Sequence, residues 1–171
     1  MEKDVTIWHA PGFVQVSHEV PLVVPNDLKL GVPVWLHCSI HHDKQTGNWW
    51  ITLLSKPNVD IGYWPKELFN LLDNGANIVG VGGVVQASRS GSSPPMGNGN
   101  FPTGSYTRSA MFKSVGFLDS KYEHHSMDSK EKLVDSPKCY GLGIERTIPF
   151  RFAPPGFFFN FGDPGGNSCG V

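Results

Sequence analysis

Apolar and polar residues alternate with a period of two over much of this chain, which is the spacing of a half-buried β-strand. In residues 32–42, Val34, Leu36, Cys38 and Ile40 share one face, and the residues between them share the other. Strands are expected over residues 12–24, 32–42, 48–54, 59–64, 77–86, 105–118, 139–152 and 157–161. The short polar turn at 43–47, which ends in glycine, predicts that the early strands form an antiparallel meander.

A single segment has a helical pattern. Pro65 stands where a first helical residue is favoured, and Asn74-Gly75 supplies a stop. Its apolar face would consist of Leu68, Leu71 and Leu72. The pattern predicts one short helix near residues 65–74, of about two turns, which must pack on other elements to be stable.

The composition extends this interpretation to the whole chain. The 171 residues include 20 glycines and 14 prolines, and aromatic residues make up 12%. Glycine and proline favour turns, whereas aromatic and β-branched residues favour strands. We therefore expect an all-β protein in one domain, residues 1–171, with a long loop at 87–105 and an exposed excursion at 119–137.

Charge and targeting signals exclude several classes of protein. The net charge is −1 and 17% of residues are charged, so neither a nucleic-acid partner nor a membrane surface is expected. No run of about 18 apolar residues predicts a transmembrane helix. No signal peptide follows Met1, which indicates a cytoplasmic protein if this start is genuine, or a true start further upstream.

The chain has three cysteines, so at least one thiol is unpaired within it. Either all three are reduced, which the pattern slightly favours, or Cys139 pairs with Cys169 and Cys38 is a buried free thiol. Cys38 is not expected to be a nucleophile, because alternation places it on the opposite strand face from His37 and His41. The core-thiol interpretation is preferred.

No motif for nucleotide binding, for a serine nucleophile or for zinc proteolysis occurs. His37 and His41 would lie roughly 13 Å apart along a strand, too far for one zinc ion with ligand distances near ~2 Å. The other histidines, and the six glutamates, are expected to be solvated. No metal and no cofactor is therefore predicted.

Several short blocks occur in a distinctive order. They are 11–15 (PGFVQ), 47–50 (GNWW), 62–69 (GYWPKELF), 82–85 (GGVV), 94–102 (PPMGNGNFP), 139–140 (CY) and 162–166 (GDPGG), followed by Cys169. In this order they resemble the neprosin family of plant proteins. GYWPKELF and PPMGNGNFP are the most specific, and the resemblance extends from Pro11 to Cys169.

The resemblance implies a fold, an activity and a disulfide. Members of the family are secreted glutamic endopeptidases that cut at proline under acidic conditions and carry a signal peptide and a pro-region. Their domain is an antiparallel β-sandwich, and two glutamates on its sheet activate water. The resemblance also implies a disulfide between Cys139 and Cys169 where the chain meets an oxidising compartment, which places that pairing above the reduced state.

This chain departs from the family pattern where catalysis is concerned. The first catalytic glutamate is expected in an EAGW-like segment upstream of PGFVQ, but the chain starts only ten residues before Pro11, and Ala10 replaces a usual cysteine. The second follows the double glycine, as in WGGEV, and Val84 occupies that position. Losing a general acid or base costs about 10²–10⁴-fold in rate.

We therefore expect the C-terminal portion of a neprosin-type domain that is catalytically inactive, from a truncated or decayed gene copy or a partial gene model. Missing strands would leave exposed sheet edges, which favour aggregation or pairing with another chain.

Two alternatives stay open. One is a non-catalytic module that binds proline-rich peptide or cell-wall glycan. The candidate binding residues are Trp49, Trp50, Tyr63 and Trp64, whose rings offer either core area or a stacking face. The other is an acid peptidase that uses a different carboxylate pair, such as Glu145 with Asp60. The sequence leaves the oligomeric state open.

Overall fold

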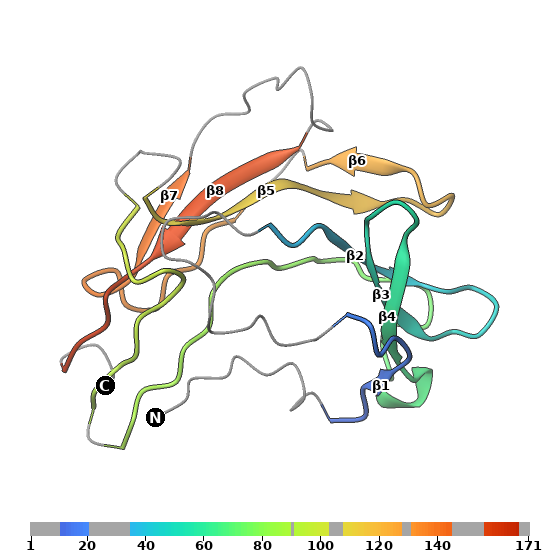
Figure 1. Ribbon diagram of the computed structural model, residues 1–171, viewed down its shortest axis with the longest axis horizontal. Coiled ribbons are helices and arrows are strands. Elements are labelled where there is room, and N and C mark those ends of the chain that lie inside the picture. Colours follow the sequence, from blue (N-terminus) through green and yellow to red (C-terminus); the bar gives the residue numbers. More distant parts are fainter. Residues whose placement is uncertain are drawn as a thin grey trace. The chain divides into compact units, whose positions relative to one another are not determined.

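The computed structural model describes residues 11–20, 35–89, 91–102, 108–127, 131–144 and 156–167. The chain divides into two compact units, Met1–Asn77 and Ile78–Val171. In the described part of each unit the strands form one four-stranded antiparallel sheet (Figure 1). This confirms the all-β, antiparallel class and the two sheets that the sequence predicts. No helix within the described ranges is long and apolar enough to cross a membrane.

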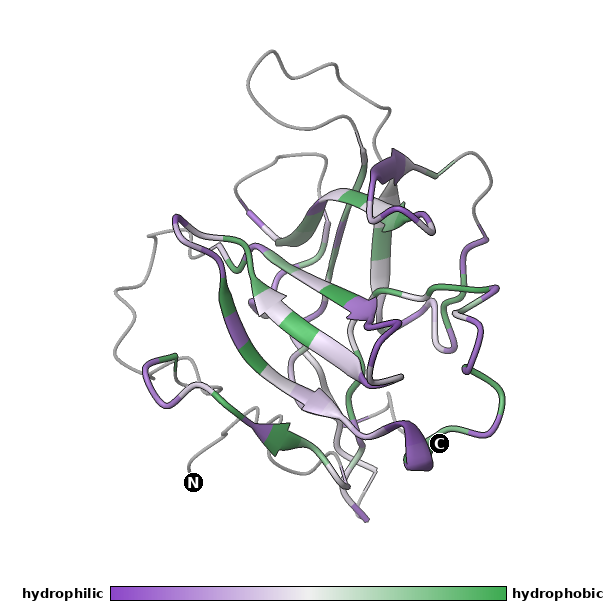
Figure 2. Cartoon of the chain, turned by 90° about the vertical axis from the view of Figure 1, so that its right-hand side faces the viewer, coloured by the Kyte–Doolittle hydropathy of each residue, from purple (hydrophilic) through white to green (hydrophobic). Residues whose placement is uncertain are grey.

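The sheet of the first unit contains the predicted meander. Its strands are β1 (Val14–Gln15), β2 (Cys38–His42), β3 (Trp49–Leu53) and β4 (Val59–Trp64), in the order β1-β4-β3-β2. In Figure 2, bands of hydrophobic colour alternate with pale or hydrophilic bands along parts of these strands. The expected strand at 12–24 is short, and residues 21–24 lie outside the described ranges.

The turn at 43–47 holds the β2–β3 hairpin together. The Gly47 N–H donates to the Asp43 carbonyl oxygen at 2.7 Å, and the Asp43 carboxylate accepts from the backbone N–H groups of Gln45 and Thr46 at 3.2 and 3.1 Å. Gly47 has a φ of 78°, which glycine adopts without steric cost. The predicted hairpin is therefore confirmed, and its register is fixed by local hydrogen bonds.

The core of the first unit centres on two isoleucines. Ile51 and Ile61 are 6% and 2% exposed. They pack with the half-buried side chains of Phe13, Val20, Leu53 and Trp64. Gly62 lets β1 approach β4, because a Cβ at this position would overlap the Val14 carbonyl oxygen.

The predicted helix near 65–74 is wrong in length and type. Only Lys66–Leu68 is helical, as a single 3₁₀ turn (η2), and Phe69 is already extended, with φ −123° and ψ 121°. Leu68 and Leu71 are 47% and 92% exposed. A two-turn helix is unstable without packing, and this apolar face has too little packing to sustain one.

The predicted strand at 77–86 is also wrong. This segment has no strand structure, and no described residue forms a hydrogen bond with its backbone. Ile78 and Val84 are 89% and 96% exposed. The β-branched residues suit a strand, but a strand needs a neighbour for its N–H and C=O groups, and the glycines of this segment weaken it further.

The sheet of the second unit is built around the C-terminal aromatic strand. Its strands are β5 (Ala110–Leu118), β6 (His124–Ser126), β7 (Gly141–Ile144) and β8 (Phe157–Gly162), in the order β6-β5-β8-β7. The predicted strand at 157–161 is confirmed, and the one predicted at 105–118 is confirmed from Ala110 onward, with residues 105–107 outside the described ranges. The excursion expected at 119–137 contains β6, which folds back on β5 as a hairpin. The strand expected at 139–152 begins at Gly141, and residues 145–152 lie outside the described ranges.

The two faces of β8 differ in chemistry. On one face, Phe112 of β5 stacks on Phe159 and Phe161, with ring centroids 5.2 and 5.3 Å apart. On the other face Asn160 lies between its cross-strand partners, Met111 and Gly143. Asn160 is 2% exposed, and neither polar atom of its side chain has a hydrogen-bond partner in the described part of the chain.

The long loop at 87–105 is tied to the C-terminal turn. Bridges join Ser93 to Gly166 and Met96 to Asp163, and the Tyr140 hydroxyl donates to Ser93 Oγ at 2.5 Å. The loop turns at Gly91, Gly97 and Gly99, which have φ values of 81°, 64° and 79°. Two of the sequence blocks, PPMGNGNFP and GDPGG, therefore meet in space.

Candidate functional site

An apolar pocket lies on one face of the first unit's sheet. Its volume is about 600 Å³, and it is shallow and open to solvent. It is lined by Pro11, Ile40, Trp49, Trp64, Leu68, Phe69 and Leu72. None of these side chains is charged, so the pocket suits apolar groups and aromatic stacking.

The strand register brings the sheet part of this lining together. Trp49 of β3 pairs directly with Trp64 of β4, so both rings lie on the same face. Ile40 lies on that face too, because it is two residues before His42, the partner of Trp49. The alternation of three adjacent strands thus builds a continuous apolar wall.

The 3₁₀ turn closes the other side of the pocket. The Lys66 N–H donates to the Asn48 side-chain oxygen at 3.1 Å, which ties η2 to the start of β3. The Leu68 side chain lies over Gly12, where an added Cβ would come within 2.6 Å of it. Gly12, with a φ of 82°, therefore allows the segment beside Pro11 to pack against η2.

The four aromatic candidates divide between the two faces of the sheet. Trp49 and Trp64 line the pocket, and Trp64 also contacts Phe13, with ring centroids 4.8 Å apart. Trp50 and Tyr63 contact each other on the opposite face with tilted rings, whose centroids are also 4.8 Å apart. Alternation along each strand separates neighbours in sequence, so the four residues do not form one stacking face.

Five lining residues are absent from the sequence-based candidates. Leu68, Phe69 and Leu72 belong to the segment that was expected to form a packed helix. Ile40 was predicted only to share a strand face with Val34, Leu36 and Cys38, and it is 55% exposed at the pocket rim. Pro11 was recognised only as the start of a sequence block. The signal for Leu68, Phe69 and Leu72 is the apolar run that follows GYWP, which the helical pattern assigned to the wrong structure.

Val84, which the family resemblance predicts at the position of the second catalytic glutamate, lies in residues 78–86 of the second unit, whose backbone forms no hydrogen bond with any described residue. Its side chain is 96% exposed. The preceding Gly83 is packed, because an added Cβ would come within 2.7 Å of Met96 and 2.8 Å of Phe161. Gly83 is therefore packed within the second unit, whereas an added Cβ at Gly82 would meet no atom within 4 Å and the valine projects into solvent.

The cysteines differ from the interpretation that the pattern favoured. Cys38 is a free thiol, but it is exposed rather than buried, because its strand is at the edge of the sheet. Neighbouring atoms partly desolvate it, which raises the pKa of its thiol. Cys139 is in a disulfide, so the alternative in which all three are reduced is wrong. Cys169 lies outside the described residues, and its pairing with Cys139 stays a prediction.

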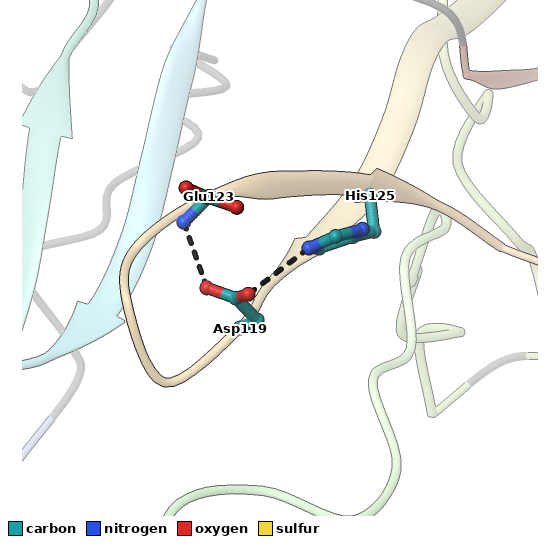
Figure 3. A group of neighbouring side chains, drawn as sticks. All are labelled: Asp119, Glu123 and His125. Atoms are coloured by element: carbon teal, nitrogen blue, oxygen red, sulfur yellow. Dashed lines mark hydrogen bonds and ion pairs between the residues drawn. The ribbon is translucent and has the colours of Figure 1, made fainter.

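One group of potential metal ligands occurs among the described residues, at the β5–β6 turn. The side chains of Asp119, Glu123 and His125 place ligand atoms within 4.8 Å of one another (Figure 3). One Asp119 oxygen accepts from the backbone N–H groups of Lys121 and Glu123 at 2.8 and 2.9 Å, and the other pairs with His125 Nε2 at 3.1 Å. Asp119 therefore braces the hairpin, and the backbone N–H of Glu123 leads the contacts that lower the pKa of its carboxyl group.

The alternative carboxylate pair is only partly visible. The Asp60 carboxylate accepts a hydrogen bond from the Thr52 hydroxyl at 2.7 Å. Glu145 lies outside the described residues. The pairing of these two acids stays a prediction.

A comparison with family models identifies the family of this chain. The family model described as Neprosin matches residues 8–164, which is most of the chain. The matched range contains the strands of both sheets, the pocket-lining residues and Val84. This chain belongs to the neprosin family.

Proposed function

We propose that this neprosin-domain protein does not hydrolyse peptides. The observation that supports this is Val84, at the position where the family pattern has a glutamate after the double glycine. General acid–base catalysis needs a group that accepts and donates a proton, and an isopropyl group does neither. Removing one such group lowers a rate by about 10²–10⁴-fold.

The surroundings of Val84 support the same proposal. Catalytic carboxylic acids have their pKa values tuned by burial and by neighbouring charges. A carboxylate at this position would be hydrated, because the Val84 side chain is 96% exposed. A single substitution would therefore supply the acid without the environment that makes it effective.

The test measures cleavage of fluorogenic proline-containing peptides between about pH 3 and pH 7, where carboxylate pairs act. The purified chain and its Val84→Glu variant are compared with an active neprosin-family peptidase. We expect no cleavage above background for either protein. Cleavage by the wild-type chain would overturn the proposal, and loss of that cleavage in Asp60→Asn and Glu145→Gln would identify the alternative pair. Cleavage by Val84→Glu alone would show that the valine is what stops catalysis.

A second candidate function is the binding of proline-rich peptide, and the apolar pocket favours it. Trp49 and Trp64 present aromatic surface, and Leu68 and Phe69 close the pocket without introducing charge. Such a lining suits a proline ring or an aliphatic side chain, since apolar burial stabilises by about 25 cal/mol per Å².

Two neighbouring leucines give a matched test of this binding. Leu68 lines the pocket, whereas Leu71 is 92% exposed and does not line it. Leu68→Glu should weaken binding of a proline-rich decapeptide by about tenfold or more in calorimetry, and Leu71→Glu should leave it unchanged. Equal effects of the two substitutions would exclude the pocket. If cell-wall oligosaccharides bound instead, and Leu68→Glu weakened their binding in the same way, the ligand would be a glycan rather than a peptide.

A further inference from the structure

β2 is the last strand in the sheet order, and at Cys38 and Ile40 its outer edge has no strand partner among the described residues. The His37 carbonyl accepts from Leu54 N–H at 2.7 Å, and the Asp43 N–H donates to the Asn48 carbonyl at 2.9 Å. Backbone groups of an antiparallel strand alternate in direction, so the odd-numbered residues of β2 face β3. Cys38 and Ile40 therefore direct their N–H and C=O groups to the outer edge, where no described residue pairs with them.

This open edge adjoins the apolar pocket at Ile40. The Ile40 backbone belongs to the edge, and its side chain, 55% exposed, forms the nearest wall of the pocket. A strand laid against β2 would place the residue opposite Ile40 with its side chain on the same face. The edge thus offers backbone hydrogen bonds beside an apolar site for one side chain, which is the arrangement of peptide recognition by strand addition.

We infer that an extended peptide adds to β2 as an antiparallel strand, with an apolar side chain opposite Ile40 that packs into the pocket. The inference rests on the peptide-binding candidate described above and adds its geometry. The peptide residue opposite Ile40 exchanges both of its backbone hydrogen bonds with Ile40, and the residue two positions away does the same with Cys38.

This register determines where prolines are tolerated. The residue opposite Ile40 must donate an N–H, so it is not proline. The residues on either side of it direct their backbone away from β2, so proline is accepted there, as it is on edge strands. The favoured ligand therefore has an apolar residue with an N–H between two prolines, whereas a continuous polyproline run is rejected.

The experiment uses the whole chain and three nonapeptides. The first has a central leucine, prolines at alternate positions and serines between them. The second replaces the leucine by N-methylleucine, which keeps the side chain and removes the N–H. The third keeps the central leucine and has proline at all of the remaining positions. Calorimetry measures affinity, and the rate of Cys38 alkylation reports whether the peptide lies along β2, since this thiol is exposed.

We expect the first peptide to bind and to slow alkylation. N-methylation should weaken binding by roughly threefold to tenfold or more, since it leaves the Ile40 carbonyl without its donor, and the third peptide should bind as weakly. Ile40→Lys should abolish binding, whereas Val14→Lys, on the opposite edge strand β1, should leave it unchanged.

The possible failures are distinguishable. Equal binding of the first two peptides, or binding that leaves Cys38 alkylation unchanged, would overturn strand addition while leaving the pocket as a binding site. Equal losses in the two lysine variants would also overturn it. If no peptide binds, peptide binding and strand addition both fail, but the proposal that the chain lacks hydrolytic activity is unaffected.

Discussion

Asn160 offers a direct test of the packing of the second unit. It lies in β8, which has β5 on one side and β7 on the other, and its side chain is 2% exposed. Its amide oxygen and nitrogen have no hydrogen-bond partner in the described part of the chain. Its cross-strand neighbours, Met111 and Gly143, offer no side-chain hydrogen bond of comparable strength. Folding therefore removes this amide from water without replacing the hydrogen bonds that it loses.

The expected effect of Asn160→Leu follows from this geometry. A buried polar group without a partner costs about 1–3 kcal/mol, and its replacement by an apolar group of similar shape removes that cost. Leucine branches at the same carbon as asparagine, so the change in shape is small. We expect the free energy of unfolding to rise by about 1–3 kcal/mol. A chain of this size gains about 2–4 °C in Tm per kcal/mol.

The assay is urea unfolding at 25 °C, followed by tryptophan fluorescence and far-ultraviolet circular dichroism, with the slope m compared between variants. Asn160→Ala is the control, because it removes the same polar groups but leaves a cavity, and it should stabilise less or destabilise. If Asn160→Leu lowered the free energy of unfolding by 1 kcal/mol or more, the amide would have a partner, such as an ordered water, and the reasoning would fail.

Two further predictions concern a close approach and a titration. Gly62→Ala should destabilise the chain by about 1–3 kcal/mol, because the added Cβ would overlap the Val14 carbonyl oxygen. The control is Gly80→Ala, whose Cβ would meet no atom within 4 Å and which should change the free energy of unfolding in urea by less than about 0.5 kcal/mol. Equal effects of the two substitutions would contradict this account. Backbone hydrogen bonds lower the pKa of the Asp119 carboxyl group. The stability that this carboxylate gives the β5–β6 hairpin is therefore complete above the pKa of an unfolded aspartate, and it is lost as the pH falls through the lower pKa of the folded state. A carboxyl titration by NMR should therefore give a midpoint below about 3.9, and a midpoint at or above that value would rule out the bracing role.

Alternation predicted the strands whose partners lie nearby in sequence. The β2–β3 hairpin and β4 follow from it, because short turns bring their partners together and each strand has one apolar face. The aromatic strand β8 was also found, since its phenylalanines are strong strand formers. The β6 strand was missed because its polar residues carry no apolar period, and its pairing depends on the turn that Asp119 braces.

Local pattern failed where structure depends on distant neighbours. The segments 65–74 and 77–86 have the residues of a helix and of a strand, but a short helix needs packing and a strand needs a partner. The residues of the pocket were likewise predictable only in part. Trp49 and Trp64 stood out as large aromatic residues, whereas Leu68 could be placed at the pocket only once the chain was known to leave the helix after one turn.

The exposure of Val84 also determines what a carboxylate would do at this position. An isopropyl group surrounded by water contributes almost nothing to packing, so its exchange for a carboxylate would meet no steric obstacle and lose no apolar contact. The side chain at this position is therefore free to change, and a carboxylate introduced here would be an ordinary surface acid. To act in hydrolysis, such an acid would also need a partner acid and neighbouring groups that exclude solvent around position 84.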